Sequence, residues 1–391
     1  MSASKSARLP RTVWIVGLVS LFMDISSETI HALLPLFLTT TLGASVALVG
    51  LVDGISESTA AIGKVFSGYI SDRIGKRKPL ILFGYGLAAV TKPLFALATS
   101  PMYVLAARFA DRIGKGFRGA PRDALIADVT PEAMRGRAYG LRQALDTVGA
   151  FVGPLLAIAL MALFNDNMRA VFWVAIIPAI VSVSLVLFGV EDRSAKEEAR
   201  APIHFRDLAS LPAHFWLLMV VGAMFTLARF SEAFLILKAN ADGLPVMLAP
   251  LVLVVMNVVY ALGAYPAGVL ADRASARSLL MLGIAVLIGA DLMLALAPGL
   301  AGAFAGIALW GAHMALTQGV FAKLVADIAP ERLRASAFGI FNLLTGLALL
   351  FASVLAGLVW DMLGSAATFL IGAALAGAAA GAAILTAPRR P

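Results

Sequence analysis

The sequence GYISDR at residues 68–73 recurs in altered form as GVLADR at residues 268–273, an offset of 200 residues. A second pair, ADVTPEAMR at 127–135 and ADIAPERLR at 326–334, matches at an offset of 199 residues. Two independent matches at nearly one offset are hard to obtain by chance, and such repeats decide an architecture before single elements are considered. The chain is therefore predicted to contain two copies of one structural unit.

The composition indicates a membrane protein. Of the 391 residues, 60% are hydrophobic and 14% are charged, and the mean hydropathy is +0.91. A soluble fold has too much surface facing water to hide this much apolar side chain, and the same numbers exclude a disordered chain. Because the chain has no cysteine, a disulfide framework, a thiolate metal site and a cysteine nucleophile are excluded.

Apolar runs of about 20 residues, each long enough to cross the hydrocarbon core as a helix, recur along the whole chain. The predicted fold class is therefore all-α, with twelve transmembrane helices in two pseudo-symmetric halves related by an axis along the membrane normal. The predicted domains are a six-helix half at 1–190, a solvated cytoplasmic linker at 191–211 and a second six-helix half at 212–391. The predicted spans are 12–38, 45–70, 79–98, 102–127, 138–163, 170–189, 213–237, 245–270, 278–297, 300–327, 335–360 and 364–386.

The basic residues indicate the orientation of the chain. If the N-terminus is cytoplasmic, the cytoplasmic segments hold 19 of the 31 basic residues, and the opposite loops hold only Arg169 and Lys238. This asymmetry follows the positive-inside rule. We therefore expect a multi-pass protein of the cytoplasmic (inner) membrane with both termini in the cytoplasm. The net charge of +8 is therefore explained by the basic residues of the cytoplasmic segments. Nucleic acid is not an expected partner, because no basic patch is interleaved with exposed aromatic residues.

The repeat and the spans are accompanied by a motif made of Gly68, Asp72, Arg73, Gly75 and Lys76. On these features, the sequence resembles the major facilitator superfamily across essentially its whole length. The resemblance implies twelve helices, a central cavity between the halves and rocking-type alternating access.

The resemblance also implies a gating latch on the cytoplasmic side, formed by Asp72, Lys76 and Asp128. Physically, an aspartate placed like Asp72 can cap a neighbouring helix N-terminus and pair with a cation. The alternative is that these basic residues only follow the positive-inside rule, which leaves Gly68, Asp72 and Gly75 unexplained.

On the fifth span, Gly140, Gly149, Gly153 and Pro154 resemble the helix-5 motif associated with antiporters, although its trailing glycine pair is replaced by Ala157 and Ile158. Small residues also allow close helix packing without any bearing on the direction of transport. Both interpretations stay open.

Charges inside the predicted spans gather in the first half. Intramembrane charges are expensive and usually face a cavity or a partner. Acids at helical spacing on neighbouring spans exceed the local bases there, and carboxylates close together in a low dielectric cannot all ionise cheaply. Each acid has a structural alternative, an ion pair such as Arg142 with Asp146. The proton-coupling candidates are Asp24, Glu28, His31, Asp53, Glu57, Asp146 and Glu232.

Basic residues follow the fourth span at helical period and favour a substrate with an anionic group. Counting back from Asp128 selects Arg108 as the equivalent of the family's helix-4 arginine, whereas counting to Gly116 selects Arg112, so both remain candidates. The substrate-binding candidates are Arg108, Arg112, Lys115, Arg142 and Arg229.

One motif in the fourth span is misleading. The sequence GKGFRG at 114–119 reads G-x-G-x-x-G, but the dinucleotide fingerprint requires a preceding strand, and here a membrane span precedes it. The glycines are expected to loosen the helix or to let another helix approach. No cofactor and no metal site are expected.

The sequence thus predicts a secondary active transporter, not an enzyme, that exports a small organic and possibly anionic molecule by proton antiport, as an efflux protein. The expected partners are this substrate, protons and the lipid bilayer, and the chain is expected to act as a monomer. The alternatives are proton-symport uptake of a metabolite or metal chelate, and a membrane receptor or scaffold that transports nothing.

Overall fold

The computed structural model describes residues 9–74, 76–191, 211–273, 275–330 and 333–385. Within these residues every regular element is a helix, and each predicted span corresponds to one helix or to one broken helix. The all-α, twelve-helix prediction is therefore confirmed. The predicted linker at 191–211 lies almost entirely outside the described residues.

The helices form two compact units. The first unit comprises Met1–His31 and Thr59–Ala199, and the second comprises Ala32–Ser58 and Arg200–Pro391, within the described parts of these ranges. The helix α3 (Val46–Ile74) contributes residues to both units. The sequence-based boundaries at 190 and 212 stay predictions.

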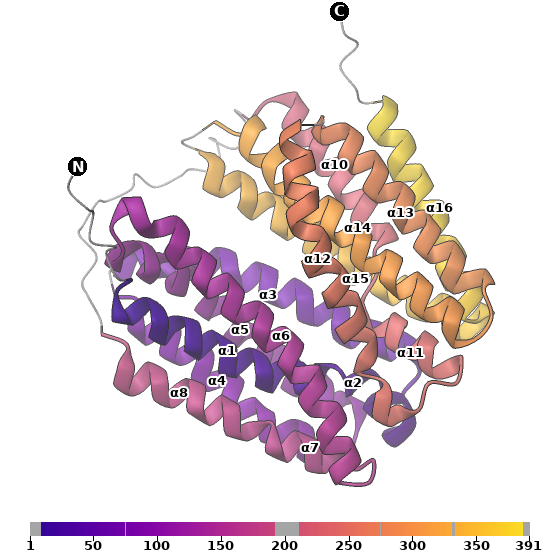
Figure 1. The fold of residues 1–391 in the computed structure, drawn as a ribbon, viewed down its shortest axis with the longest axis horizontal. Coiled ribbons are helices and arrows are strands. Elements are labelled where there is room, and N and C mark those ends of the chain that lie inside the picture. Colours follow the sequence, from indigo (N-terminus) through magenta and orange to yellow (C-terminus); the bar gives the residue numbers. More distant parts are fainter. Residues whose placement is uncertain (1–8, 75, 192–210, 274, 331–332, 386–391) are drawn as a thin grey trace, which may run out of the picture. The chain divides into compact units, whose positions relative to one another are not determined.

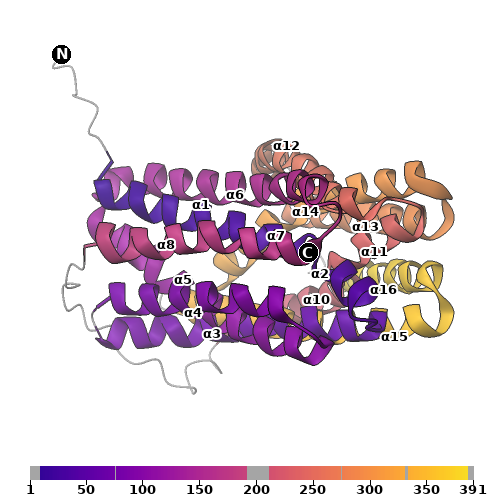
Figure 2. The ribbon, with the colours of Figure 1, turned by 90° about the horizontal axis from the view of Figure 1, so that it is seen from below.

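The first unit is built around α1. The helices α6 and α8 pack along α1, and α4 packs against α5 (Figures 1 and 2). Buried apolar side chains such as Val16, Val19, Tyr85 and Ile126 form its core. The elements are α1 (Arg11–His31), α4 (Lys78–Leu97), α5 (Pro101–Val129), η2 (Glu132–Met134), α6 (Arg135–Leu163), α7 (Met168–Val174) and α8 (Ile176–Gly189).

In the second unit, α13 packs between α14 and α16 (Figure 1), and α12 packs against α14. Aromatic side chains pack together in this unit, where the Phe230 ring lies against Trp310 of α14 and Phe369 of α16. The elements are α2 (Leu34–Leu36), η1 (Phe37–Thr41), α10 (Ala213–Ala228), α11 (Ala233–Ala241), η3 (Val246–Leu248), α12 (Leu251–Arg273), α13 (Ala276–Leu296), α14 (Gly299–Ile328), α15 (Arg334–Leu363) and α16 (Ser365–Leu385).

Eleven helical segments within the described residues are long and apolar enough to cross a membrane. The remaining predicted span is α5, whose six charged residues between Arg108 and Arg122 lower its hydropathy. A helix that is too polar for lipid has to bury its charges against protein, and α5 does so: Arg108, Asp111, Arg112 and Arg118 are each at most 5% exposed.

Two spans that carry candidate residues are interrupted, which the sequence did not predict; the sixth span, which carries none, also breaks at Ala175, between α7 and α8. The first span breaks after His31, and the seventh breaks at residues 229–232, between α10 and α11. Each break releases backbone groups in the middle of a span, and such groups line binding sites in discontinuous transport helices. Arg229 and Glu232, two candidate residues, lie in the second break.

Candidate functional site

The helix α5 carries the charged cluster of the first unit. It begins cleanly, because the Ser100 side chain accepts a hydrogen bond from the Tyr103 N–H and Pro101 occupies the first turn. It ends at Val129, where Thr130 is extended. Between these ends, charged residues recur every three or four positions and therefore share one face.

Asp111 is the centre of this cluster. Its Oδ1 accepts a hydrogen bond from Lys92 Nζ of α4 at 2.9 Å, and Lys92 also donates to Ser27 Oγ at 3.0 Å. Nitrogens of Arg108 and Arg112 lie 3.9 Å and 3.8 Å from Asp111 Oδ2. One buried carboxylate thus lies among three bases, and Lys92 makes the shortest contact with it.

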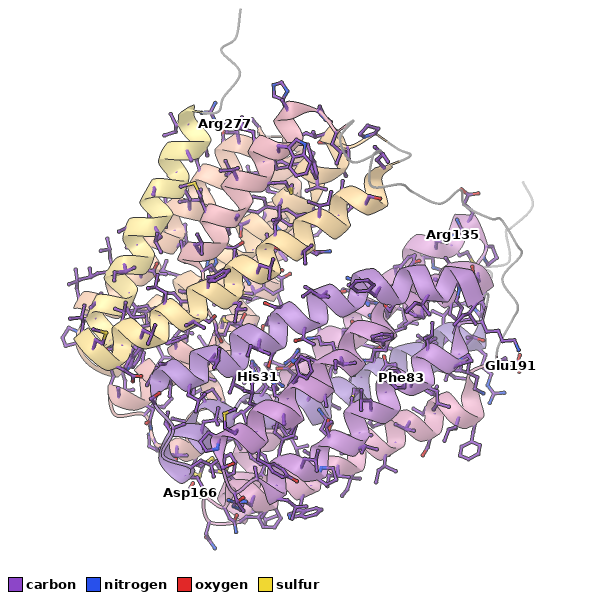
Figure 3. All side chains as sticks on the ribbon, turned by 180° about the vertical axis from the view of Figure 1, so that it is seen from behind. His31, Phe83, Arg135, Asp166, Glu191 and Arg277 are labelled. Atoms are coloured by element: carbon purple, nitrogen blue, oxygen red, sulfur yellow. The ribbon has the colours of Figure 1, made fainter. Side chains whose placement is uncertain are left out.

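His31 lies at the end of α1, beside this cluster. Figure 3 places it between the end of the first unit that carries Arg135 and Glu191 and the opposite end that carries Asp166. A nitrogen of Arg108, Nη2, lies 2.7 Å from His31 Nδ1. Because a guanidinium can only donate, His31 Nδ1 must be the acceptor, and this hydrogen bond requires a neutral ring with its proton on Nε2.

A second group of charges surrounds Arg142 and Asp146 of α6. These two form the ion pair that the sequence offered as the structural alternative, at 3.2 Å. Arg142 also contacts Asp123 at 3.3 Å, and Asp123 in turn pairs with Arg122 at 3.2 Å. Arg142, a substrate-binding candidate, and Asp146, a proton-coupling candidate, therefore belong to one ion-pair network.

The acids of α1 pack against the glycines of the helix-5 motif. A Cβ atom added to Gly149 would lie 2.8 Å from Asp24 Cβ, and one added to Gly153 would lie 2.7 Å from Glu28 Cβ. Thr29 Oγ1 donates to the Gly153 carbonyl oxygen at 3.0 Å. Close packing against α1 therefore accounts for both glycines, whereas an added Cβ at Gly140 would meet nothing within 4 Å. The charged groups that act on Asp24 include Asp146, Arg118 and Lys115.

In the second unit, Asp53 of α3 is buried and accepts a hydrogen bond from Ser231 Oγ at 2.6 Å. Ser231 belongs to the break between α10 and α11, where Arg229 is within electrostatic reach of Glu232 and Glu57. The break thus gathers the remaining candidates, Asp53, Glu57, Arg229 and Glu232. The predicted approach of Glu28 to Glu57 involves residues of different units and stays a prediction.

Of the predicted gating motif, Gly75 lies outside the described residues, as do the side chains of Asp72 and Arg73. Within the described part, the ion pair of Asp128 is with Arg77, at 3.3 Å, and Arg77 also donates to Ser71 Oγ at 2.6 Å. Lys76, which the resemblance placed in the latch, is exposed.

The glycines of GKGFRG let helices approach, as expected. A Cβ added to Gly114 would lie 2.6 Å from the Gly84 carbonyl oxygen of α4, and one added to Gly116 would lie 2.8 Å from Gly63 Cα of α3.

Sequence reasoning missed several partners in the first unit. The Arg118 guanidinium carbon lies over the Tyr85 ring, 4.7 Å from its centroid. The Tyr85 hydroxyl also shares a 3.1 Å hydrogen bond with Ser20 Oγ. Lys92 carried a signal, since it is a lone base in an apolar span. Tyr85, Ser20 and Ser27 carried none, because small polar residues are common in membrane helices for packing alone.

An internal sequence repeat, twelve spans and buried charges on α5 are typical of a polytopic membrane transport protein. The family model described as Major Facilitator Superfamily matches residues 16–320 and 239–391. An uncharacterized MFS-type transporter of Methanocaldococcus jannaschii is 32% identical over 375 residues, covering 94% of this chain and 93% of that one. The chain belongs to the major facilitator superfamily.

Two further comparisons place it among transporters. The "Probable 4-methylmuconolactone transporter" of Cupriavidus pinatubonensis is 33% identical over 169 residues, 42% of this chain and 38% of that protein. The crystal structure of the nucleoside transporter NupG has the same fold, with a TM-score of 0.77 at 16% identity, covering 96% of this chain and 98% of that one. The NupG structure shows the shared fold, whereas the family match and the MFS-type relative support the transporter class, and the family is generally non-enzymatic.

Proposed function

We propose that this secondary transporter carries a small organic anion together with a proton, and that Arg108 and His31 couple the two. The observation that carries the proposal is the 2.7 Å contact between Arg108 Nη2 and His31 Nδ1. A similarity to a transporter named for 4-methylmuconolactone supports a small organic substrate.

The anion would bind to the arginines beside Asp111. Three bases surround this carboxylate, and Lys92 makes the shortest contact with it. Arg108 and Arg112 are the substrate-binding residues in this proposal, and Lys115 and Arg118 extend the basic face of α5. Planar guanidinium groups bind carboxylate and phosphate with two parallel hydrogen bonds.

The sign of the coupling follows from the geometry. An anion that takes Arg108 away from His31 leaves Nδ1 open to a proton, and the resulting imidazolium adds a positive charge beside the anion. Each ligand therefore strengthens the binding of the other by the same factor. Proton and anion then move in the same direction, which is symport.

Export by proton antiport is the second candidate, as the helix-5 motif predicts. Gly149 and Gly153 contact α1 beside Asp24 and Glu28, so the motif borders the acids that an antiport mechanism would use. In that mechanism a neutral or cationic substrate would compete with protons for these carboxylates. The inner-membrane location, cytoplasmic termini and monomeric state remain part of this proposal.

The test begins with a thermal-shift screen of the purified protein against small carboxylates, phosphates, nucleosides and sugars, because a ligand stabilises the folded state it binds. For the best carboxylate or phosphate, R108A is expected to weaken binding roughly 10- to 100-fold, the loss of one or two charge-assisted hydrogen bonds. R169A is the matched control, since Arg169 lies outside the cluster and donates to the Ala96 carbonyl oxygen.

Direction is measured in proteoliposomes with an imposed pH gradient. Accumulation of the anion on the side that receives protons supports symport, and its movement against the protons supports export. His31→Gln should retain exchange of anion between identical pools but lose the response to the gradient. Unchanged affinity in R108A and R112A would refute the anion site, and binding without any transport would favour the receptor alternative.

A further inference from the structure

A buried acid of the second unit has no part in the proposed coupling. Asp291 is 0% exposed on the apolar helix α13, and neither of its carboxylate oxygens has a hydrogen-bond partner within the described residues. It is the only acid of α13, and Arg277, the only base, lies 14 residues away, about 21 Å along the helix.

An aromatic ring that belongs to a larger aromatic cluster lies near the Asp291 carboxylate. A Cβ added to Gly372 of α16 would lie 2.9 Å from Asp291 Oδ2 and 3.0 Å from a ring carbon of Phe230, so carboxylate and ring share one small space. The Phe230 ring packs against Trp310 and Phe369, with centroids 5.5 Å apart in both cases. Trp310 is also fully buried, and its indole N–H has no acceptor among the described residues.

The internal repeat shows what this place holds in the first unit. At the 199-residue offset, Asp291 corresponds to Lys92 and Trp310 corresponds to Asp111. The structure supports the register, because Gly84 of α4 approaches Arg118 of α5 and, 199 positions later, Gly283 of α13 approaches Thr317 of α14. Lys92 and Asp111 make a closed ion pair. In the second unit, Asp291 takes the position of Lys92, and the indole of Trp310 takes the position of Asp111.

An ionised Asp291 would therefore be a buried charge without its counter-charge. The other titratable groups on the helices that pack against α13 are His313, Lys323 and Asp327 of α14 and Tyr260, Tyr265, Asp272 and Arg273 of α12, while α16 has none. Through Phe230, Asp291 also faces the break that carries Arg229 and Glu232. His313 is buried against Trp310 and Phe225, with centroids 5.3 and 6.2 Å apart, and Lys323 is exposed.

We propose that Asp291 is a proton-binding site of the second unit, separate from His31 and the acids of α1. A metal ion does not fit, because hard cations take about six or more oxygen ligands, and within the described residues no group of three or more His, Cys, Asp or Glu side chains could hold one. A proton on one carboxylate oxygen removes the buried charge without any further ligand.

Asp291 is connected through neighbouring residues to the break between α10 and α11. Phe230, which borders Asp291, is followed in the α10–α11 break by Ser231, whose hydroxyl donates to Asp53. A charge on Asp291 would displace Phe230 or draw water into its shell, and either change would disturb Ser231. The proton at Asp291 thereby stabilises the break in the form seen here.

The test compares the melting temperatures of wild type and D291N in detergent from acidic to alkaline pH, without any substrate. An amide copies the shape of the neutral acid, so the two proteins should melt close together at acidic pH. As the pH rises, the unfolded wild-type chain releases the proton that the folded chain holds. The unfolding equilibrium of wild type should then shift by up to ~10-fold per pH unit relative to D291N.

The matched control is D361N, because both oxygens of Asp361 accept backbone N–H groups, from Val46 and Ala47. This variant should lose stability and show no such gain at alkaline pH. A D291N protein that is less stable than wild type by the same amount at every pH, or no different at any pH, overturns the proposal.

If D291N does not fold, wild type is treated with dicyclohexylcarbodiimide, which modifies protonated carboxyl groups in apolar surroundings. Mass spectrometry should find Asp291 modified at acidic pH and progressively less so at alkaline pH. An unmodified Asp291 at acidic pH in the folded protein, with modification after denaturation, overturns the proposal. Because neither measurement uses an anion or a gradient, its failure is distinct from failure of the proposed symport.

Discussion

The buried pair of Lys92 and Asp111 should respond asymmetrically to substitution. Asp111 is 3% exposed and Lys92 is 1% exposed, and their atoms are 2.9 Å apart, while nitrogens of Arg108 and Arg112 lie 3.9 and 3.8 Å from the same carboxylate. At an effective dielectric constant of about 20, each attraction amounts to roughly 4–6 kcal/mol before desolvation is subtracted. Replacing Lys92 removes about two fifths of the attraction on Asp111, but replacing Asp111 removes a shared counter-ion from three bases.

We therefore expect K92M to cost about 2 kcal/mol of stability and D111N about 3–5 kcal/mol, the range for a broken buried pair. The double variant K92M/D111N should cost less than the sum of the two, with a coupling free energy of about 1–3 kcal/mol. The assay compares the thermal unfolding of wild type, the two single variants and the double variant in one detergent. Unfolding is followed by the fraction of protein that stays monodisperse after heating. Equal losses in the two single variants, or a double variant that equals their sum, would refute the idea that Asp111 serves three bases.

Two further predictions concern packing. Gly153→Ala should destabilise the protein by about 1–3 kcal/mol because the new Cβ meets Glu28 Cβ at 2.7 Å and the Ile25 carbonyl oxygen at 3.0 Å; Gly140→Ala, in the same motif but with open space around it, should be neutral or stabilising, and equal melting temperatures for the two would contradict the packing role. Asp361→Ala should cost about 1 kcal/mol because it removes the cap from the first N–H groups of α3, and a melting temperature equal to that of wild type would show that water replaces the cap.

Sequence alone predicted the repeat, the twelve spans and the concentration of charge in the first half, because hydropathy and spacing are properties of single helices. Contacts between helices depend on how each helix is rotated about its axis, and nothing in the order of residues fixes that rotation. Lys92 is a lone base in an apolar span, yet its pairing with Asp111 required the structure. The same holds for Arg108 and His31, which are 77 residues apart.

The break in the seventh span was missed for a different reason. Residues 229–232 contain neither glycine nor proline, the usual signals of an interruption, so the seventh span read as continuous. The charges of Arg229 and Glu232 were the available signal. Two charged residues in the middle of an apolar span need polar surroundings, and an opened backbone supplies them together with Ser231 and Asp53.

The repeat also shows that the charges of the first unit are not required to build it. The close approach of α4 and α5 at Gly84 has a counterpart at Gly283 of α13 and α14, where the facing residue is Thr317 in place of Arg118. The same crossing thus forms without an arginine. Where Lys92 and Asp111 pair in the first unit, the second has Asp291 and Trp310. Burying these charges costs desolvation free energy, and the α4–α5 crossing does not need them for its packing. That they stand on α5, beside His31, is the physical reason to look for the substrate and the proton there.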